Sequence, residues 1–296
     1  FSDAVEMCNN NGACRKLDSG VMCPSYRVTK EEKDLVRGRA NTLRLALSNQ
    51  LPEGSFASKD MYETMELCVS CKACQRERPM SVDMAKMKSE FLSHYYKKFS
   101  MPIKDRVISN MPRIIWLLKI IAPTFNKVKN LPLISNIVNK FGFATEREMP
   151  EVQSQDALKE IYNSQPVSEN KVILFADTFN INFENKNLIY SIKVLNKFGY
   201  QAIIPSYGKD NLSRPLCCGR TYISYGQLDK AASELNRFND YILENNYYDL
   251  PVVGIEPSCL LTLNDEYLSL KNINNRGKIK NKFYLLEEFI LDQLKI

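Results

Sequence analysis

Three closely spaced cysteines, Cys68, Cys71 and Cys74, constrain this chain more than any other feature of its sequence. The spacing C-x2-C-x2-C lets one tight loop direct three sulfurs at a single small object, as in runs that bind [4Fe-4S] clusters and end in C-x3-C-P. Here Arg78 stands before Pro79 in place of that last cysteine. The last cysteine of such a run usually ligates the other cluster of a two-cluster protein, so its replacement leaves the site of the first three cysteines intact.

A cube-shaped [4Fe-4S] cluster needs four thiolates, so the three-cysteine run requires a fourth ligand from elsewhere in the chain. Cys23 is followed by Pro24, and a Cys-Pro pair is how cluster-binding runs end. We therefore predict that Cys23 joins Cys68, Cys71 and Cys74 to hold one complete [4Fe-4S] cluster. The alternative is a zinc site with four cysteine ligands, although C-x2-C-x2-C crowds three ligands in a way that structural zinc sites seldom use.

A second cluster would use Cys8, Cys14 and the position of Arg78. Arginine is a permanent cation without an acceptor atom and cannot ligate iron, which leaves only two thiolates. We expect the second cluster to be absent, unstable or completed by an unusual ligand. On the alternative interpretation, Cys8 and Cys14 are ordinary buried thiols that pack as small hydrophobic residues.

The remaining cysteines form a different pattern, with the adjacent pair Cys217 and Cys218 before Gly219 and a single Cys259 in the segment GIEPSC. Adjacent thiols can bridge irons in a less regular cluster or act as a redox pair, and Gly219 permits close backbone approach. Cys259 follows a predicted strand and is expected at the start of a helix, where the helix dipole favours a thiolate. Sites of α/β proteins gather at the carboxyl ends of strands, which favours a functional role over the alternative of buried hydrophobic thiols.

Composition limits the classes of function that these cysteines can serve. The 296 residues allow one to three domains, and 44% hydrophobic with 25% charged residues exclude a disordered chain. Nine cysteines without a signal peptide indicate metal ligation in a reducing compartment rather than a disulfide framework. The net charge of +6 accompanies no nucleic-acid-reading motif, so we expect no nucleic acid partner and at most docking on an acidic partner or an anionic membrane face.

Other candidate sites are weak. Glycine-rich phosphate loops are absent from the sequence, so we expect no nucleotide or flavin site in this chain. The sole histidine, His94, is expected to have a surface or packing role. The longest apolar stretch, Ile114 to Pro123, is too short to span a bilayer and indicates a buried or interfacial helix. We expect a cytoplasmic protein, either free or peripheral at the inner face of the membrane.

Hydrophobic periodicity predicts an α/β protein in three parts. Residues 1–98 are expected to be helical, with a capping box at 29–32 that opens a helix to Ser48, a short helix from Asp60 that delivers Cys68, and a helix over 82–96. Residues 99–165, rich in proline and free of cysteine, are expected to be a broken helical connector. Residues 166–296 alternate strands and helices, which predicts a small parallel sheet. The expected strands are 172–176, 202–204 and 252–255, and the expected helices are 185–198, 226–246 and 283–294.

The chain resembles the iron–sulfur half of FAD-linked 2-hydroxyacid dehydrogenases, of the D-lactate dehydrogenase and glycolate oxidase type, in the segments CNNNGACRKLDSGVMCPSYRVTKEEKDLVRGRANTLR and CVSCKACQRERPMSVDMAKMKSEFL. It is similar to the cysteine-rich CCG domain that follows in that family in DTFNINFENKNLIYSIKVLNKFGY, PLCCGR and GIEPSCLLTLNDEY. The resemblance implies a two-cluster ferredoxin-like helical domain in 1–98 and a small parallel α/β CCG domain in 166–296. It assigns the role of cluster ligands to Cys8, Cys14, Cys23, Cys68, Cys71 and Cys74. It assigns the role of CCG-domain cysteines to Cys217, Cys218 and Cys259.

The sequence departs from that family at several points. Arg78 replaces the expected cysteine, and Asp177 stands where some CCG domains begin with a cysteine. The FAD domain expected before Phe1 and the second CCG unit expected after Ile296 are not in this sequence. We therefore expect a truncated chain or one piece of a split enzyme.

The resemblance implies an electron-transfer module that is not catalytic alone. FAD on an attached domain or partner subunit would oxidise a 2-hydroxyacid such as D-lactate or glycolate, and single electrons would pass to the CCG domain or to a membrane acceptor. One alternative is a heterodisulfide-reductase-like or glycerol-3-phosphate-dehydrogenase-like iron–sulfur subunit with Cys217 and Cys218 at its reactive centre, although the missing second CCG unit counts against it. The other alternative is a non-redox zinc-binding scaffold.

Overall fold

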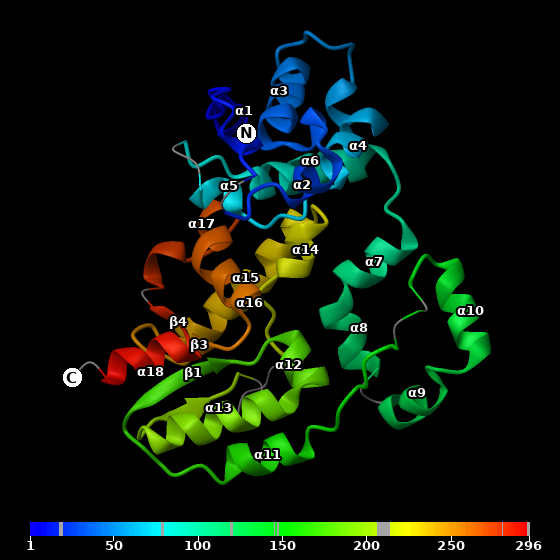
Figure 1. Cartoon of the computed structure of the whole chain (residues 1–296). Helices are drawn as coiled ribbons and strands as arrows, with labels where there is room; N and C mark the ends of the chain where they lie inside the picture. The colour runs from blue at the N-terminus through cyan, green and yellow to red at the C-terminus, as the bar shows by residue number, and fades with distance from the viewer. Residues whose placement is uncertain are drawn as a thin grey trace. The chain divides into compact units, whose positions relative to one another are not determined.

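A computed structural model describes residues 1–17, 20–77, 80–118, 121–144, 146, 148–205, 214–279 and 281–294 of the chain. The contacts divide into two compact units, whose elements are labelled in Figure 1. The first unit comprises Phe1–Met101 and Ile223–Leu228, and the second comprises Pro102–Tyr222 and Asp229–Ile296. Each unit has a hydrophobic core of its own. The predicted division into 1–98, 99–165 and 166–296 stays a prediction.

Among the described residues of the first unit, all regular elements are helices. Its interior contains apolar side chains from several helices, among them the fully buried Leu35, Leu43, Met65 and Phe91. The cysteines that contribute to the same core are Cys8, Cys14, Cys23 and Cys74. The elements are α1 (Ser2–Glu6), η1 (Ala13–Arg15), α2 (Pro24–Thr29), η2 (Glu32–Asp34), α3 (Val36–Leu47), η3 (Ser55–Ala57), α4 (Lys59–Glu66), α5 (Ala73–Arg76) and α6 (Met84–Lys98).

Two helices of this unit begin at side-chain caps, close to the positions that the sequence predicted. Ser58 accepts a hydrogen bond from the Met61 amide at 3.2 Å at the start of α4. Asp83 accepts one from the Lys86 amide at 3.1 Å at the start of α6. The helix that delivers Cys68 and the helix predicted over 82–96 are therefore both confirmed.

The capping box predicted at Thr29 was wrong. Thr29 is the last residue of α2, and Lys30 leaves that helix with a left-handed φ of 60°. The Thr29 hydroxyl donates a hydrogen bond to the Asp34 carboxylate at 2.7 Å instead of capping a following helix. The single predicted helix is divided by the η2 turn, and α3 begins only at Val36, because Thr29 and Asp34 belong to a polar network inside the unit.

The second unit contains a four-stranded parallel sheet with the strand order β2-β1-β3-β4. Its strands are β1 (Lys171–Phe175), β2 (Gln201–Ile203), β3 (Val252–Gly254) and β4 (Phe283–Leu285). Three of them confirm the predicted small parallel layer. β4 was missed, since 283–294 was expected to be one helix, whereas its first three residues pair with β3 and α18 (Leu286–Leu294) begins only afterwards. Because β4 passes directly into α18 without a turn, the sequence does not mark its end, and the pairing with β3 defines it.

Helices precede the sheet and alternate with its strands. The remaining elements are α7 (Ile103–Ser109), α8 (Met111–Leu118), α9 (Ala122–Val128), α10 (Pro132–Lys140), α11 (Asp156–Asn163), α12 (Thr178–Phe183), α13 (Asn185–Lys197), α14 (Arg220–Ser224), α15 (Leu228–Glu244), α16 (Pro257–Leu261), the π-helical η5 (Thr262–Glu266), α17 (Tyr267–Ser269) and η6 (Arg276–Lys278). The helices predicted over 185–198 and 226–246 are confirmed as α13 and α15. Within the described ranges, no helix has the length and apolar character needed to cross a membrane.

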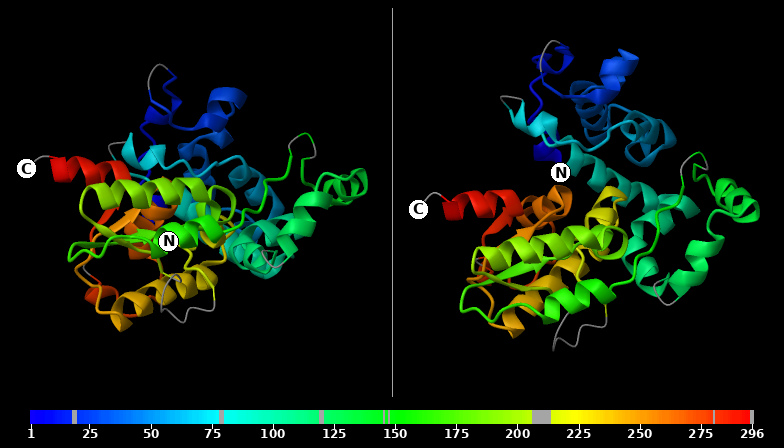
Figure 2. Two further views of the ribbon diagram at one scale, coloured as in Figure 1. Left: turned by 90° about the horizontal axis from the view of Figure 1, so that it is seen from below. Right: turned by 60° about the horizontal axis from the view of Figure 1, so that its bottom comes forward.

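The sheet is covered by helices on both faces. On one face, Val172 and Leu174 of β1 share a core with Leu158 of α11 and with side chains of α13 and α18. On the opposite face, the ring of Phe175 contacts Phe238 of α15 with a centroid distance of 6.0 Å. α11 and α13 lie below the sheet in Figure 1, and the left view of Figure 2, seen from below, shows them side by side in front of it. α11 falls within the segment predicted to be a connector and packs as part of this α/β layer.

Candidate metal centres

Four cysteines of the first unit, Cys23, Cys68, Cys71 and Cys74, line one pocket. These are the residues predicted to hold a [4Fe-4S] cluster, and the structure brings all four together although Cys23 is far from the others in the sequence. Four thiols are the donor set that such a cluster binds, so the residues present fit this cofactor. Their role as ligands stays a prediction.

Helix ends and a strained loop place these thiols. Cys23 is the N-cap residue of α2 and has a left-handed φ of 51°, while Cys68 follows the last turn of α4. Cys71 lies between Ser70 and Lys72, whose φ values of 54° and 58° are also left-handed. Left-handed backbone is uncommon outside glycine, and such strain gathers at functional sites. The loop geometry is therefore typical of a site whose ligand positions are imposed by its surroundings.

Cys74 lies in α5 and is the most deeply shielded member of the run. Burial raises the pKa of this thiol to about 12, and a hydrogen bond from the Met84 amide lowers it only in part. A thiol in this environment loses its proton only when a cation takes its place, as iron does when it binds. Amide hydrogen bonds to ligand sulfurs are also among the interactions that set the reduction potential of a cluster.

A partly buried lysine stands beside the Cys68 end of the pocket. Lys88 of α6 donates hydrogen bonds to the backbone carbonyls of Glu66 at 2.8 Å and Cys68 at 2.6 Å. Burial lowers the pKa of Lys88, while the nearby Cys68 raises it. The ammonium group thus connects α6 to the end of α4 and brings a positive charge next to a predicted ligand.

Replacing Lys88 by methionine is expected to lower the reduction potential of a cluster in this pocket by about 60 mV, a tenfold change in the one-electron equilibrium. The physical reason is that a neighbouring positive charge stabilises the reduced cluster, which carries one more electron. A redox titration monitored by EPR measures the potential. Lys86→Met is the control, because Lys86 lies on the same helix with its ammonium 3.6 Å from Asp83. Equal shifts in the two variants would contradict the prediction.

Cys8 and Cys14, the cysteines predicted for a second site, are both buried in the core of the first unit. Cys8 follows α1, and Cys14 lies in the η1 turn. The pKa of Arg37 is raised chiefly by a hydrogen bond to Glu32. Electrostatic interactions of its guanidinium with Cys14 and Cys8 raise this pKa further. The third predicted position, Arg78, lies outside the described residues. The state of the second site therefore stays a prediction.

Cys217, Cys218 and Cys259, the third group of predicted site residues, are buried and meet in the second unit. The thiols of Cys217 and Cys218 are hydrogen-bonded to each other, and Cys218 is also hydrogen-bonded to Cys259. The bond to Cys218 and burial raise the pKa of Cys217 well above its ordinary value. The bond with Cys217 lowers the pKa of Cys218, but the bond with Cys259 and burial outweigh it and leave that pKa well above its ordinary value. Cys217 and Cys218 are therefore protonated at neutral pH in this arrangement.

The local backbone explains this close approach. Gly219 has a φ of 80°, and a Cβ added to it would stand 3.2 Å from the backbone of Ala231 on α15, which confirms the predicted role of this glycine. Cys259 lies in α16 just after β3, as predicted, beside the point between β1 and β3 where the strand order reverses. At the matching end of β1, Asp177 caps α12 by accepting hydrogen bonds from two backbone amides at 2.9 and 3.0 Å. The residue that departs from the CCG pattern thus has a structural role.

A buried carboxylate that the sequence analysis did not identify holds the segment before Cys217. Glu234 of α15 has no exposed surface and accepts hydrogen bonds from Arg214 at 2.5 and 2.8 Å and from Arg237 at 2.9 Å. Arg237 also donates to the carbonyls of Arg214 and Pro215, just before the cysteine pair. The signal in the sequence was an acidic residue on the largely apolar buried face of α15.

In the described part of the chain, no three His, Cys, Asp or Glu side chains are arranged to hold one metal ion. The thiolates of a cube bind four separate iron atoms, whereas a zinc site draws its ligands around one atom, so this finding bears on single ions and not on a cluster. His94 packs edge-on against Phe56 at a centroid distance of 5.4 Å, in agreement with its predicted packing role.

Residues 4–82, which contain the first six cysteines, match the protein family described as the 4Fe-4S dicluster domain. The N-terminal part of the chain is thus similar in sequence to iron–sulfur domains. No solved structure matches this chain.

Three curated relatives with similar sequences are each named D-2-hydroxyglutarate dehydrogenase. The protein from Pantoea ananatis is 25% identical over 88% of this chain and 29% of its own length, and that from Escherichia coli is 22% identical over the same shares. The protein from Pseudomonas putida is 23% identical over 99% of this chain and 32% of its own length. The resemblance to 2-hydroxyacid dehydrogenases is confirmed, and this chain spans less than a third of the length of these relatives.

Proposed function

We propose that this chain is the iron–sulfur electron-transfer module of an FAD-linked 2-hydroxyacid dehydrogenase. One observation carries the proposal: Cys23, Cys68, Cys71 and Cys74 meet at one pocket within the residues that match a 4Fe-4S domain. The names of the curated relatives favour D-2-hydroxyglutarate as the hydroxyacid, in place of the D-lactate or glycolate expected from the sequence. The chain would not be catalytic alone, because its sequence contains no glycine-rich loop for a flavin or nucleotide phosphate.

In this proposal, the first unit holds and tunes a cluster while a flavin on another domain or subunit reacts with the substrate. Oxidation of a 2-hydroxyacid to a 2-oxoacid releases two electrons and two protons, which a flavin accepts together. A bound [4Fe-4S] cluster supplies one-electron redox chemistry. The four cysteine thiolates would bind the irons, and the Lys88 ammonium and the Met84 amide would adjust the potential.

The finer arrangement belongs to the same proposal. We place a ferredoxin-like helical domain in 1–98 and a CCG domain in 166–296, joined by 99–165. The group of Cys217, Cys218 and Cys259 would be a second redox centre, either as ligands of further iron or as a dithiol pair. The electron acceptor would be this group or a membrane-associated partner met from the cytoplasm.

The experiment that tests the proposal is metal and redox analysis of the chain purified under anaerobic conditions. Iron, acid-labile sulfide and zinc are assayed, and EPR spectra are recorded after reduction with dithionite. About four irons per chain and a reducible cubane signal support the electron-transfer module. A colourless protein with stoichiometric zinc would support the zinc scaffold and reject the proposal.

Replacing Arg78 by cysteine is expected to raise the iron content from about four towards about eight per chain. The reason is that this change would add a third thiolate to the predicted set of Cys8 and Cys14. The same iron and sulfide assays measure the result, and Arg76→Cys is the control because it adds a thiol two positions away. An iron content that rises equally in both variants, or in neither, would show that the second site lacks more than this ligand.

A further inference from the structure

A four-thiolate site requires that Cys23 stay within reach of the Cys68–Cys74 loop, although the two segments are far apart in the sequence. We propose that Arg39 and Glu77 are positioning residues that hold Cys23 in the ligand set, an inference that rests on the function proposed above. Each of them makes hydrogen bonds to residues that flank Cys23 and connects them to the elements that carry the cysteine run.

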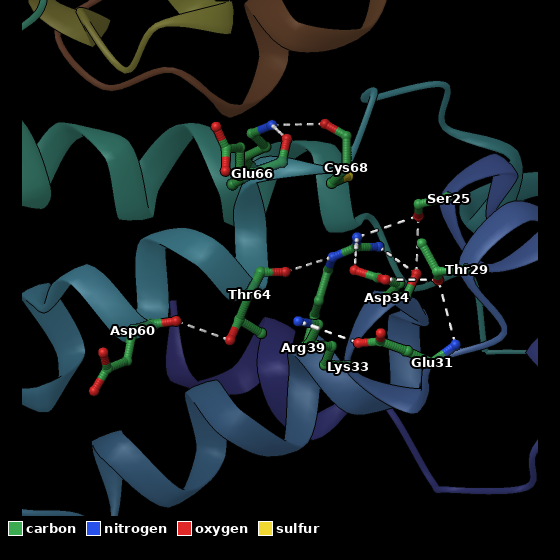
Figure 3. A network of polar contacts seen from close by, with 11 residues as sticks. Ser25, Thr29, Glu31, Lys33, Asp34, Arg39, Asp60, Thr64, Glu66 and Cys68 are labelled. Atoms are coloured by element: carbon green, nitrogen blue, oxygen red, sulfur yellow. Dashed lines mark hydrogen bonds and ion pairs between the residues drawn. The ribbon is translucent and has the colours of Figure 1, made fainter.

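Arg39 joins three elements of the first unit through one guanidinium group (Figure 3). Its Nε donates to the carbonyl of Thr64 on α4 at 2.9 Å, and Nη1 donates to the carbonyl of Asp34 at 2.7 Å. Nη2 donates to the hydroxyl of Ser25 on α2 at 3.2 Å. Ser25 lies two residues after Cys23, and α4 leads directly into the cysteine run. The guanidinium therefore ties the start of α2 to the helix that delivers the other ligands.

Arg39 also forms part of the wall of the cysteine pocket. Its side chain is 2% exposed, and the Asp34 carboxylate that balances its charge is fully buried, with an oxygen 3.5 Å from Nη2. The same carboxylate accepts the hydrogen bond from Thr29, which fixes its orientation. A buried ion pair contributes little net stability, because the desolvation of both charges offsets their attraction. The ion pair therefore contributes to the site by orienting the Arg39 guanidinium rather than by adding stability.

A lysine at position 39 cannot make the same connections. The guanidinium presents five donors in a rigid plane, whereas an ammonium is a point charge on a flexible chain. Lysine would keep a positive charge opposite Asp34 but would lose simultaneous reach to Ser25 and Thr64. The Arg39→Lys change therefore separates a positioning role from simple charge balance.

The other flank of Cys23 is held from the far end of the cysteine run. Glu77 follows α5, the helix of Cys74, and its carboxylate accepts hydrogen bonds from the amides of Val21 at 2.8 Å and Met22 at 3.2 Å. These two amides immediately precede Cys23. Arg39 and Glu77 thus hold Cys23 from both sides against the loop with which it shares the pocket.

The test uses the full chain purified anaerobically, with iron content, sulfide content and EPR spectra as readouts. When Cys23 is no longer held, a bound cluster would lack one of its four protein ligands, and the iron that Cys23 would bind is expected to be lost first. Arg39→Lys and Glu77→Ala are each expected to lower the iron content from about four to about three per chain. Each is also expected to release iron to a chelator about tenfold faster than the unmodified chain. A three-iron cluster gives an EPR signal when oxidised, whereas the four-iron cube gives its signal when reduced.

Arg37→Lys is the matched control, because Arg37 lies on the same helix and its Nε pairs with Glu32 at 2.6 Å. It is expected to keep about four irons per chain. If Arg39→Lys loses its helical circular dichroism, the iron content and release rate of Ser25→Ala test the positioning role instead. That variant removes one hydroxyl and leaves the buried ion pair in place. A chain without any cluster overturns the proposed function. A cluster that keeps its iron, spectra and release rate in Arg39→Lys, Ser25→Ala and Glu77→Ala overturns this inference alone.

Discussion

Replacing Cys23 by alanine is expected to lower the iron content of the anaerobically purified chain from about four to about three per molecule or fewer. Cys23 is the one proposed ligand from outside the cysteine run, and it lines the same pocket as Cys68, Cys71 and Cys74. With three thiolates left, one corner of the cube has no protein ligand and its iron is lost. Assays of iron and acid-labile sulfide measure the composition, and EPR of the oxidised protein identifies a three-iron product.

The matched control for this change is Cys8→Ala. Cys8 is buried in the same core, but it belongs to the second predicted site, in which Arg78 leaves only two thiolates. Alanine at position 8 is therefore expected to keep the iron content of the unmodified chain. Equal iron loss in both variants would mean that Cys8 and Cys23 serve one site, contrary to the ligand set proposed here.

Replacing Glu234 by glutamine is expected to destabilise the second unit by about 3–5 kcal/mol. The carboxylate is fully buried, with Arg214 and Arg237 hydrogen-bonded to it and the Arg113 guanidinium 3.5 Å away. Glutamine leaves three guanidinium groups around a neutral side chain. Urea unfolding followed by the fluorescence of the sole tryptophan, Trp116, which belongs to this unit, measures the loss as a lower transition midpoint.

The same carboxylate makes the stability of the second unit depend on acid pH. Burial raises the pKa of Glu234, but the hydrogen bond and charge of Arg214 and the charge of Arg237 outweigh it and hold the pKa below its ordinary value of 4.5. A carboxyl group with a lowered pKa in the folded state contributes stability that is complete above pH 4.5 and is lost as the pH falls through the lowered value.

Unfolding of the Glu234→Gln variant is therefore expected to lack this acid-dependent component. Glu244→Gln is the control, since Glu244 lies on the same helix and is exposed. Its effect is expected to stay within about 0.5 kcal/mol. If the two glutamine variants unfold at the same urea concentration and with the same pH dependence, Glu234 does not hold the segment before Cys217.

Particular residues show how far sequence reasoning reached. The site formed by Cys68, Cys71 and Cys74 could be predicted from the sequence because the three cysteines lie within seven residues. Their thiols therefore stay close together in any fold of the remaining chain. Three strands were readable as short apolar runs between helices, but β4 was not, because it passes directly into α18. The capping box predicted at Thr29 was wrong because a threonine hydroxyl can also join a buried hydrogen-bond network. Here the Thr29 hydroxyl donates to the Asp34 carboxylate.

The sequence alone predicted the chemistry of this protein, namely which thiols are the candidate iron ligands, and it predicted the small parallel α/β layer that follows them. The Cys-Pro pair was enough to predict Cys23 as the fourth ligand, but only the tertiary structure decided that Cys23 and the cysteine run line one pocket. Only the tertiary structure identified Arg39, Glu77 and Glu234 as the charged side chains that hold the cysteine segments. The physical reason is that cysteine spacing determines which thiols lie close together only within one short segment. The hydrogen bonds of these charged side chains form only after packing has brought distant segments together.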